Sequence, residues 1–140
     1  MSFYTNDPYA GPIATFMRAA GQDVGQHLDR DTPTSLIDLR LRLIDEEVNE
    51  VFEAINARDA VWAAQELADV LYVVFGTAIA FGIPISEVFA AVSTANLSKI
   101  NPSTGEPYEV VNGKVTKGPE YEPAEPAIAE IMKSKMVGAV

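Results

Sequence analysis

Residues 61–81 are apolar on nearly every side of a helix, and this stretch most constrains what the chain can fold into. Such a helix is typical of the inside of a bundle. Two acids, Glu66 and Asp69, interrupt it three positions apart and therefore share one helical face. No basic residue between Arg58 and Lys99 can pair with them. Because buried, unpaired carboxylates are costly, we expect either raised pKa values for these two acids or a bound cation beside them.

A second acidic stretch lies upstream, in a helix predicted from residue 34 to about 58. Five acids fall within nine positions, with no lysine or arginine among them: Asp45, Glu46, Glu47, Glu50 and Glu53. Like charges three and four residues apart repel, and a solvated helix would normally intersperse basic residues. On a helical projection, Glu47 and Glu50 fall among apolar side chains and are expected to be partly buried. Glu46 lies at the margin of that sector, and the other two acids are expected in solvent.

Carboxylates at these spacings on two neighbouring helices would form an oxygen-rich cage, which suits a hard cation such as Mg²⁺ or Mn²⁺. One alternative is that the acids face solvent or pair with Arg40, Arg42 and Arg58. A di-iron site of the ferritin kind would require Glu-x-x-His on two helices. The single histidine, His27, is expected in a loop, which argues against that site and makes His27 a surface residue.

The remaining pattern predicts further helices at about residues 13–20, 86–101 and 127–137. Apolar spacing places the following residues on the core faces of the first two helices: Ile13, Phe16, Met17, Ala20, Ile37, Leu41, Ile44, Val48, Val51, Phe52 and Ile55. Thr34 or Ser35 is expected to cap the second helix and Asp59 the third, while Gly82 followed by Pro84 should end the third.

Residues 101–126 are rich in Gly, Pro, Lys and Glu, and Asn112-Gly113 between two short apolar runs predicts a small hairpin at 108–116. The expected fold is all-α, with a core like a four-helix bundle, a short hairpin or extended segment and a C-terminal helix. We expect one domain over residues 1–140, with its helical core at about 34–100, the Lys/Gly/Pro segment at 101–126 and the terminal helix at 127–137. The helices are too apolar for a lone monomer of this size, so dimerisation is expected.

Composition narrows the classes of function. Ten basic and twenty acidic residues give a net charge of −10, which disfavours binding to DNA, RNA or anionic lipid. The absence of cysteine excludes disulfides, thiolate metal sites and cysteine nucleophiles. The N-terminal residues lack the pattern of a signal peptide, and Glu66 and Asp69 break the most apolar stretch. A cytoplasmic protein without membrane or nucleic-acid partners is expected.

These motifs resemble a known family. Glu46-Glu47-Val48-Asn49-Glu50 is an EExxE motif, Glu66-Leu67-Ala68-Asp69 is ExxD, and Asn96-Leu97-Ser98-Lys99 follows. In this order they resemble the all-α NTP pyrophosphohydrolases of the MazG-like group, over about residues 36–126. The chain is similar also to dimeric dUTPase-like and phosphoribosyl-ATP pyrophosphohydrolase-like proteins. The resemblance implies a MazG-type core, a homodimer or homotetramer, and Mg²⁺- or Mn²⁺-dependent hydrolysis between the α and β phosphates.

From the acidic cluster and this resemblance we expect four metal ligands: Glu47, Glu50, Glu66 and Asp69. Catalysis is assigned to Glu46 and Glu47, with Glu46 binding a second metal or orienting and deprotonating the attacking water. Divalent ions must bridge the carboxylates and the substrate phosphates, because an acidic pocket alone would repel a triphosphate.

The substrate-binding candidates are Asn96, Lys99, Lys114, Lys117 and Tyr72. Lys99 with Asn96 would hold the pyrophosphate end, as the resemblance implies, although a lysine near a helix C-terminus also interacts with the helix dipole. Lys114 and Lys117 lie in a segment similar to GKVxKGPxY of some family members, but lysines in a polar loop also serve solubility. Tyr72 could stack on a base, although aromatic side chains at helical spacing are more often part of a core.

The predicted function is hydrolysis of a nucleoside triphosphate to the monophosphate and pyrophosphate by water attack at the α-phosphate, with (d)GTP and dUTP among the candidate substrates. One alternative is a phosphoribosyl-ATP pyrophosphohydrolase, which only the substrate distinguishes. The other is a non-catalytic, metal-stabilised module whose acidic helix binds a basic partner. The preferred base and sugar, the number of metal ions, the choice between dimer and tetramer, and the biological purpose stay open.

Overall fold

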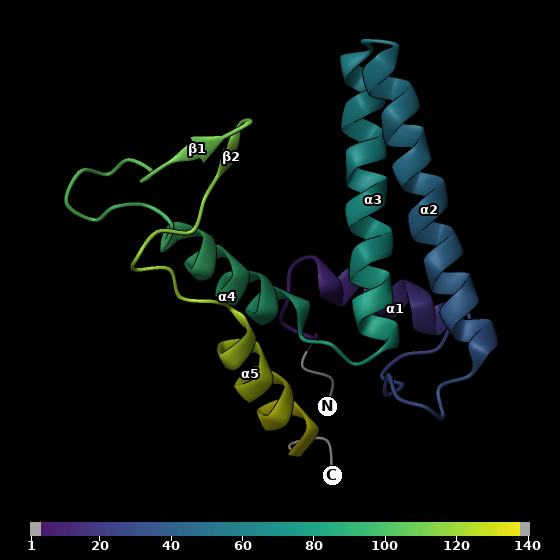
Figure 1. Cartoon of the computed structure of the whole chain (residues 1–140). Coiled ribbons are helices and arrows are strands. Elements are labelled where there is room, and N and C mark those ends of the chain that lie inside the picture. The colour runs from purple at the N-terminus through teal and green to yellow at the C-terminus, as the bar shows by residue number, and fades with distance from the viewer. Residues whose placement is uncertain (1–3, 138–140) are drawn as a thin grey trace. The chain divides into compact units, whose positions relative to one another are not determined.

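A computed structural model describes residues 4–137 of the chain (Figure 1). In this part the elements are α1 (Ala10–Ala19), α2 (Thr34–Asn56), α3 (Ala60–Ala80), α4 (Ile85–Leu97), β1 (Val110–Val111), β2 (Lys114–Val115) and α5 (Glu125–Val137). The predicted all-α fold is confirmed. The chain forms two compact units, Met1–Ile83 and Pro84–Val140, and each is described by itself. The single domain expected over residues 1–140 stays a prediction.

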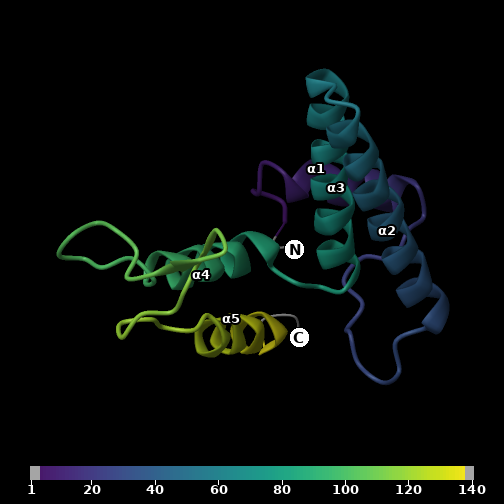
Figure 2. The same cartoon turned by 45° about the horizontal axis from the view of Figure 1, so that its top comes forward.

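The first unit is built on a hairpin of two long helices. Helices α2 and α3 lie side by side (Figures 1 and 2), and three residues connect them, so they run antiparallel. Asp59 caps α3 as predicted, because its Oδ1 accepts hydrogen bonds of 3.0 Å from the backbone nitrogens of Val61 and Trp62. This cap fixes the first turn of the helix that carries Glu66 and Asp69.

The ends of these helices follow the expected chemistry with two exceptions. Gly82 ends α3 with a φ of 66°, as predicted, since glycine adopts the left-handed conformation without strain. Arg58 takes the equivalent position after α2 with a φ of 57°, where no glycine is present. The prediction that Thr34 or Ser35 caps α2 was wrong. The Pro33 carbonyl accepts from the nitrogens of Leu36 and Ile37, so the helix begins directly after Pro33. Thr34 and Ser35 therefore already lie inside the helix.

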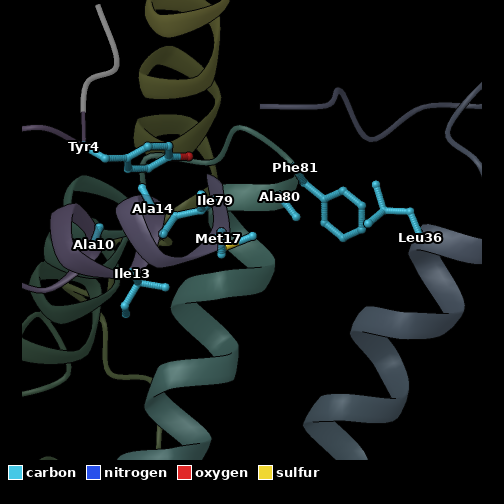
Figure 3. Packing of buried hydrophobic residues seen from close by; sticks show 9 residues of the cluster. All are labelled: Tyr4, Ala10, Ile13, Ala14, Met17, Leu36, Ile79, Ala80 and Phe81. Atoms are coloured by element: carbon cyan, nitrogen blue, oxygen red, sulfur yellow. The ribbon is translucent and has the colours of Figure 1, made fainter. Parts of the chain in front are cut away.

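The core of the first unit lies where α1 crosses the C-terminal end of α3 (Figure 3). Met17 and Ile79 are almost fully buried there, and alanines on both helices allow a close approach. The ring of Phe81 points toward Leu36 of α2. The predicted core face of α1 is correct for Ile13 and Met17 only. Phe16 and Ala20 are exposed.

The hairpin of α2 and α3 is less covered than the sequence predicts. Three large side chains that were predicted on the core face of α2 are more than half exposed, namely Leu41, Phe52 and Ile55. Helix α3 also exposes Leu67 and Leu71, so the prediction that it is enclosed on all sides was wrong. By length and composition, α3 could cross a membrane, a property that core helices share, and here its C-terminal half supplies the core of the unit.

A buried arginine lies between the two long helices. Arg40 of α2 is 4% exposed, and its Nε and Nη2 donate to Thr77 Oγ1 (3.2 Å) and to the Val73 carbonyl (3.3 Å) of α3. Gly76 makes room for the guanidinium, because a Cβ there would lie 2.5 Å from Nη2. Burial lowers the pKa of Arg40 from its usual value. This contact sets how α2 and α3 are aligned.

The second unit combines α4, the hairpin and α5. Helix α5 packs on α4, and Lys135 Nζ lies 3.0 Å from Glu87 Oε1. The predicted hairpin is present with shorter strands, and its turn residues Asn112 and Gly113 have φ of 51° and 76°. Helix α4 ends at Leu97, earlier than predicted, and α5 begins two residues before the predicted start at 127.

Candidate functional site

Three carboxylates from the two long helices come together in the first unit. One oxygen each from Glu47 of α2 and from Glu66 and Asp69 of α3 lie within 4.8 Å of one another. Glu66 and Asp69 meet because they are three residues apart on α3, and Glu47 reaches them because α2 packs alongside. Glu66 is 4% exposed, while the other two are half-buried. The cluster therefore contains three of the four predicted metal ligands.

The two oxygens of Glu66 have different surroundings. Oε1 accepts a hydrogen bond of 2.8 Å from the indole Nε1 of Trp62, one helical turn earlier. Oε2 is buried and accepts from no N–H or hydroxyl donor among the described residues, and Glu50 can bond to Glu66 only when its own carboxyl group is protonated. A buried carboxylate oxygen without a donor is costly unless a proton or a cation reaches it. This oxygen and the all-carboxylate donor set fit a hard divalent cation such as Mg²⁺ or Mn²⁺.

Glu50, the fourth predicted ligand, lies beside this cluster. The prediction that Glu50 is partly buried was wrong, because its side chain is exposed. A side-chain hydrogen bond with Glu66 raises the pKa of Glu50, and the negative charge of Glu66 raises it further. Glu50 thus lies beside Glu66, the buried acid of the cluster.

Glu47 is also shifted toward its protonated form. Burial is the largest cause of its raised pKa, followed by the charges of Asp69, Glu66 and Glu46. Without a cation, Glu47 and Glu50 therefore hold their protons more tightly than isolated glutamates do. A divalent cation would relieve the same repulsion.

Glu46 lies outside the three-carboxylate cluster of the described residues, and its charge contributes, after burial and the charges of Asp69 and Glu66, to the raised pKa of Glu47. Glu46 Oε1 lies 3.8 Å from Arg42 Nε on the same helix, and both side chains are largely exposed, so this pair contributes little to stability. Within the described residues, no arginine forms an ion pair with Glu47, Glu66 or Asp69. The alternative that arginines neutralise Glu47, Glu66 and Asp69 is therefore not supported.

Tyr72 is the predicted base-stacking residue of the first unit. It lies one turn after Asp69 and is 43% exposed. Its ring meets that of Phe16 edge-on, with 6.2 Å between the centroids. Tyr72 is therefore a surface aromatic on the helix of the acids, and its contact with a base stays a prediction.

The predicted phosphate-binding residues lie in the second unit, where three of the four are connected. Lys99 Nζ donates to Asn96 Oδ1 at 2.8 Å. The same amine lies 5.8 Å from the ring centroid of Tyr121, and Lys117 Nζ lies 4.9 Å from it. Tyr121 thus gathers both lysines through cation–π contacts. Lys114 is exposed on β2.

The segment that carries Lys117 and Tyr121 is held by its own contacts. Tyr108 donates from its hydroxyl to Glu120 Oε2 at 2.6 Å, and its ring leaves no room for a Cβ on Gly118. The sequence reasoning missed the part played by Tyr121, although this tyrosine is the last residue of the GKVxKGPxY pattern. It also missed the bond from Trp62 to Glu66, whose only signal was a spacing of four residues.

The helical fold and the acidic cluster fit the class of helical nucleotide pyrophosphohydrolases, and the comparison with family models supports this class. The family model described as phosphoribosyl-ATP pyrophosphohydrolase matches residues 15–96, more than half of the chain. The chain belongs to this family, which is part of the MazG-like all-α superfamily, so the predicted resemblance is confirmed. The matched region contains the acidic cluster and Asn96 but ends before Lys99. No curated protein matches the chain.

Proposed function

We propose that this protein hydrolyses a nucleoside or deoxynucleoside triphosphate between its α and β phosphates, releasing the monophosphate and pyrophosphate. Family membership indicates a nucleotide pyrophosphohydrolase in general. The observation that carries the proposal is the buried Oε2 of Glu66, which accepts from no donor among the described residues, within the cluster formed with Glu47 and Asp69. A proton or a divalent cation satisfies such an oxygen, and a divalent cation held there would bridge the carboxylates to a polyphosphate.

In this proposal Glu47, Glu66 and Asp69 hold Mg²⁺ or Mn²⁺, with Glu50 beside them as a further ligand. When bound, such an ion would supply a Lewis acid for the phosphoryl oxygens and a water of lowered pKa. Glu47 and Glu46 act on the attacking water, which Glu46 orients and deprotonates from the edge of the cluster.

Phosphate binding is assigned to the basic residues of the second unit. Lys99, held by Asn96, and Lys117, beside Tyr121, place two cations around one aromatic ring. Lys114 would add a third positive charge from β2. Tyr72 would stack on the base. In this assignment the carboxylates of the first unit are the metal ligands, and the lysines of the second unit bind phosphate.

A second candidate substrate is phosphoribosyl-ATP. The matching family model favours it, since its description names that activity. The bond broken and the pyrophosphate released are the same, so only a direct comparison of substrates separates the two candidates.

We also propose that the protein is a cytoplasmic homodimer or homotetramer without nucleic-acid or membrane partners. Self-association is supported by the large apolar side chains that α2 and α3 expose, among them Phe52 and Leu71, since exposed apolar clusters of this kind mark interaction surfaces. Light scattering coupled to size exclusion tests this assignment, and a monomer at micromolar concentration would contradict it.

The experiment that tests the function incubates the protein with Mg²⁺ and, separately, each ribo- and deoxyribonucleoside triphosphate and phosphoribosyl-ATP. Monophosphate and pyrophosphate are measured. Turnover of a triphosphate supports the first candidate, and turnover of phosphoribosyl-ATP alone supports the second. Inactivity of the folded protein on all of them would favour the non-catalytic metal-stabilised module.

A further inference from the structure

Trp62 is the residue that decides which oxygen of Glu66 is available. Its indole Nε1 donates to Oε1 at 2.8 Å, while Oε2 is buried and accepts from no N–H or hydroxyl donor in the part of the chain that the structure describes. Because Oε1 accepts from the indole, Oε2 is the oxygen of Glu66 that can coordinate a cation. The hydrogen bond also restricts rotation of the carboxylate about its last torsion.

The backbone fixes Trp62 before its side chain reaches Glu66. The Asp59 side chain accepts from the backbone nitrogen of Trp62 at 3.0 Å, so Trp62 belongs to a capped first turn. Side chains of a helix lean toward its N-terminus, and residues four apart lie above one another, so Glu66 points back to the indole. The cap, the indole and the carboxylate form one connected path to the acidic cluster.

A neutral donor suits this position better than a charged one. A lysine or arginine bonded to Glu66 would neutralise it and compete with a metal ion for its charge. An indole N–H satisfies one oxygen and leaves the full negative charge on the carboxylate. Donors of this kind behind a metal ligand orient it, and removing them typically lowers metal affinity about 10–100-fold.

We propose that Trp62 is a positioning residue that holds Glu66 so that Oε2 alone is offered to the divalent cation. This inference rests on the proposed function, because it assumes that the cluster binds metal. It gives Trp62 a role other than stacking on a nucleotide base, which its 37% exposure would otherwise suggest.

The first test measures Mn²⁺ affinity without nucleotide, from the electron paramagnetic resonance signal of free Mn²⁺. Trp62→Phe keeps an aromatic ring and removes the donor, and its affinity should fall about 10–100-fold. The neighbouring Val61→Ala is the control, since Val61 is 83% exposed and should leave the affinity unchanged. In the active enzyme, excess Mn²⁺ should restore the turnover of Trp62→Phe. Unchanged Mn²⁺ affinity in folded Trp62→Phe, with a raised KM at saturating metal, would overturn the proposal in favour of base stacking.

The second test needs no substitution at Trp62. The chain has one tryptophan, so the indole N–H band in ultraviolet resonance Raman spectra reports this bond alone. Saturating Mg²⁺ should shift the band, because the cation draws charge from the carboxylate that accepts the bond. Asp69→Asn, which leaves the indole and Glu66 in place, should abolish the shift. If Trp62→Phe does not fold, this measurement decides, and an unchanged band at saturating Mg²⁺ overturns the proposal.

The two levels of failure are distinguishable. A wild-type protein that binds no Mn²⁺ and hydrolyses no nucleotide overturns the proposed function together with the role of Trp62. A wild-type protein that binds Mn²⁺ and turns over, with a Trp62→Phe variant of equal Mn²⁺ affinity, overturns only the role of Trp62.

Discussion

In the first unit, carboxylates stand on two long helices that pack against each other, whereas in the second, lysines stand around one half-buried tyrosine. Glu66 is almost fully buried, and its position follows from the alignment of α2 with α3. Lys117 is exposed, and its amine is held by an aromatic face 4.9 Å away. The acidic cluster is thus preorganised by packing, while the lysine pair is held by contacts worth about 0.5–1 kcal/mol each at exposed sites.

The difference suits the two kinds of charge. A metal site requires ligand atoms fixed within a few tenths of an ångström, which packed helices provide. Phosphates tolerate looser partners, because lysine acts on them as a point charge with rotatable donors. The comparison predicts large effects from changes in the cluster and smaller effects from changes around Tyr121.

The largest effect is expected for Asp69→Asn, which removes a metal ligand with little change in shape. Turnover should fall at least about 100-fold, since even the partners behind a ligand typically contribute 10–100-fold. The fold should stay intact or gain stability as repulsion among the acids falls. Steady-state kinetics at saturating Mg²⁺ measure the loss, and Asp45→Asn, which removes the same charge from an exposed position, serves as the control. Equal activity in both variants would contradict the metal assignment.

Metal binding should stabilise the first unit. A ligand that binds only the folded form adds about 2.7 kcal/mol at a concentration of 100 times its Kd. Thermal melts with and without Mg²⁺ or Mn²⁺ measure the gain, and the Asp69→Asn variant should lose most of it. A melting temperature that ignores millimolar metal would show that the cluster is not a preformed site.

A smaller effect is expected for Lys99→Gln in the second unit. Losing one phosphate contact should raise KM about 10-fold, or about 1.4 kcal/mol, while metal affinity stays unchanged. Lys133→Gln on α5 is the matched control, since it removes an exposed positive charge outside the Tyr121 group. A loss of metal affinity in Lys99→Gln would contradict the division of roles between the units.

The smallest effect is expected from a change of pH, acting on the stability of the metal-free protein. The folded-state pKa values of Glu47 and Glu50 are raised, so the stability they contribute is fully present below the ordinary glutamate pKa and is lost as pH rises through the raised values. These two groups should therefore make the free energy of unfolding of the metal-free protein, measured with urea, larger at pH 5 than at pH 7.5. The Glu50→Gln variant, compared over the same range, should show a shallower loss, and a steeper loss in this variant would contradict the assigned shift.

Much of the fold follows from local rules in the sequence. The cap at Asp59, the stop at Gly82 and the turn at Asn112-Gly113 each depend on a few neighbouring residues, and all three were correct. The clustering of Glu47, Glu66 and Asp69 was also predictable. The helical projection placed Glu47 among apolar side chains of one helix, and the spacing of three placed Glu66 and Asp69 on one face of the next helix.

The missed features depend on pairs of residues far apart in the sequence. Periodicity shows that Leu41 and Phe52 share a helical face, but it does not show whether another element covers that face. The burial of Arg40 depends on the missing side chain of Gly76 on the other helix.

The fit of Arg40 over Gly76 has a consequence for protein engineering. Arg40 precedes Glu47 by two helical turns, or about 10 Å along the axis, so a shift at the guanidinium moves the carboxylate relative to α3. A designer who transplants the acidic cluster onto another helical hairpin would have to carry the arginine and the glycine along with the acids. Without that pair, the grafted ligands would keep their chemistry but lose their register.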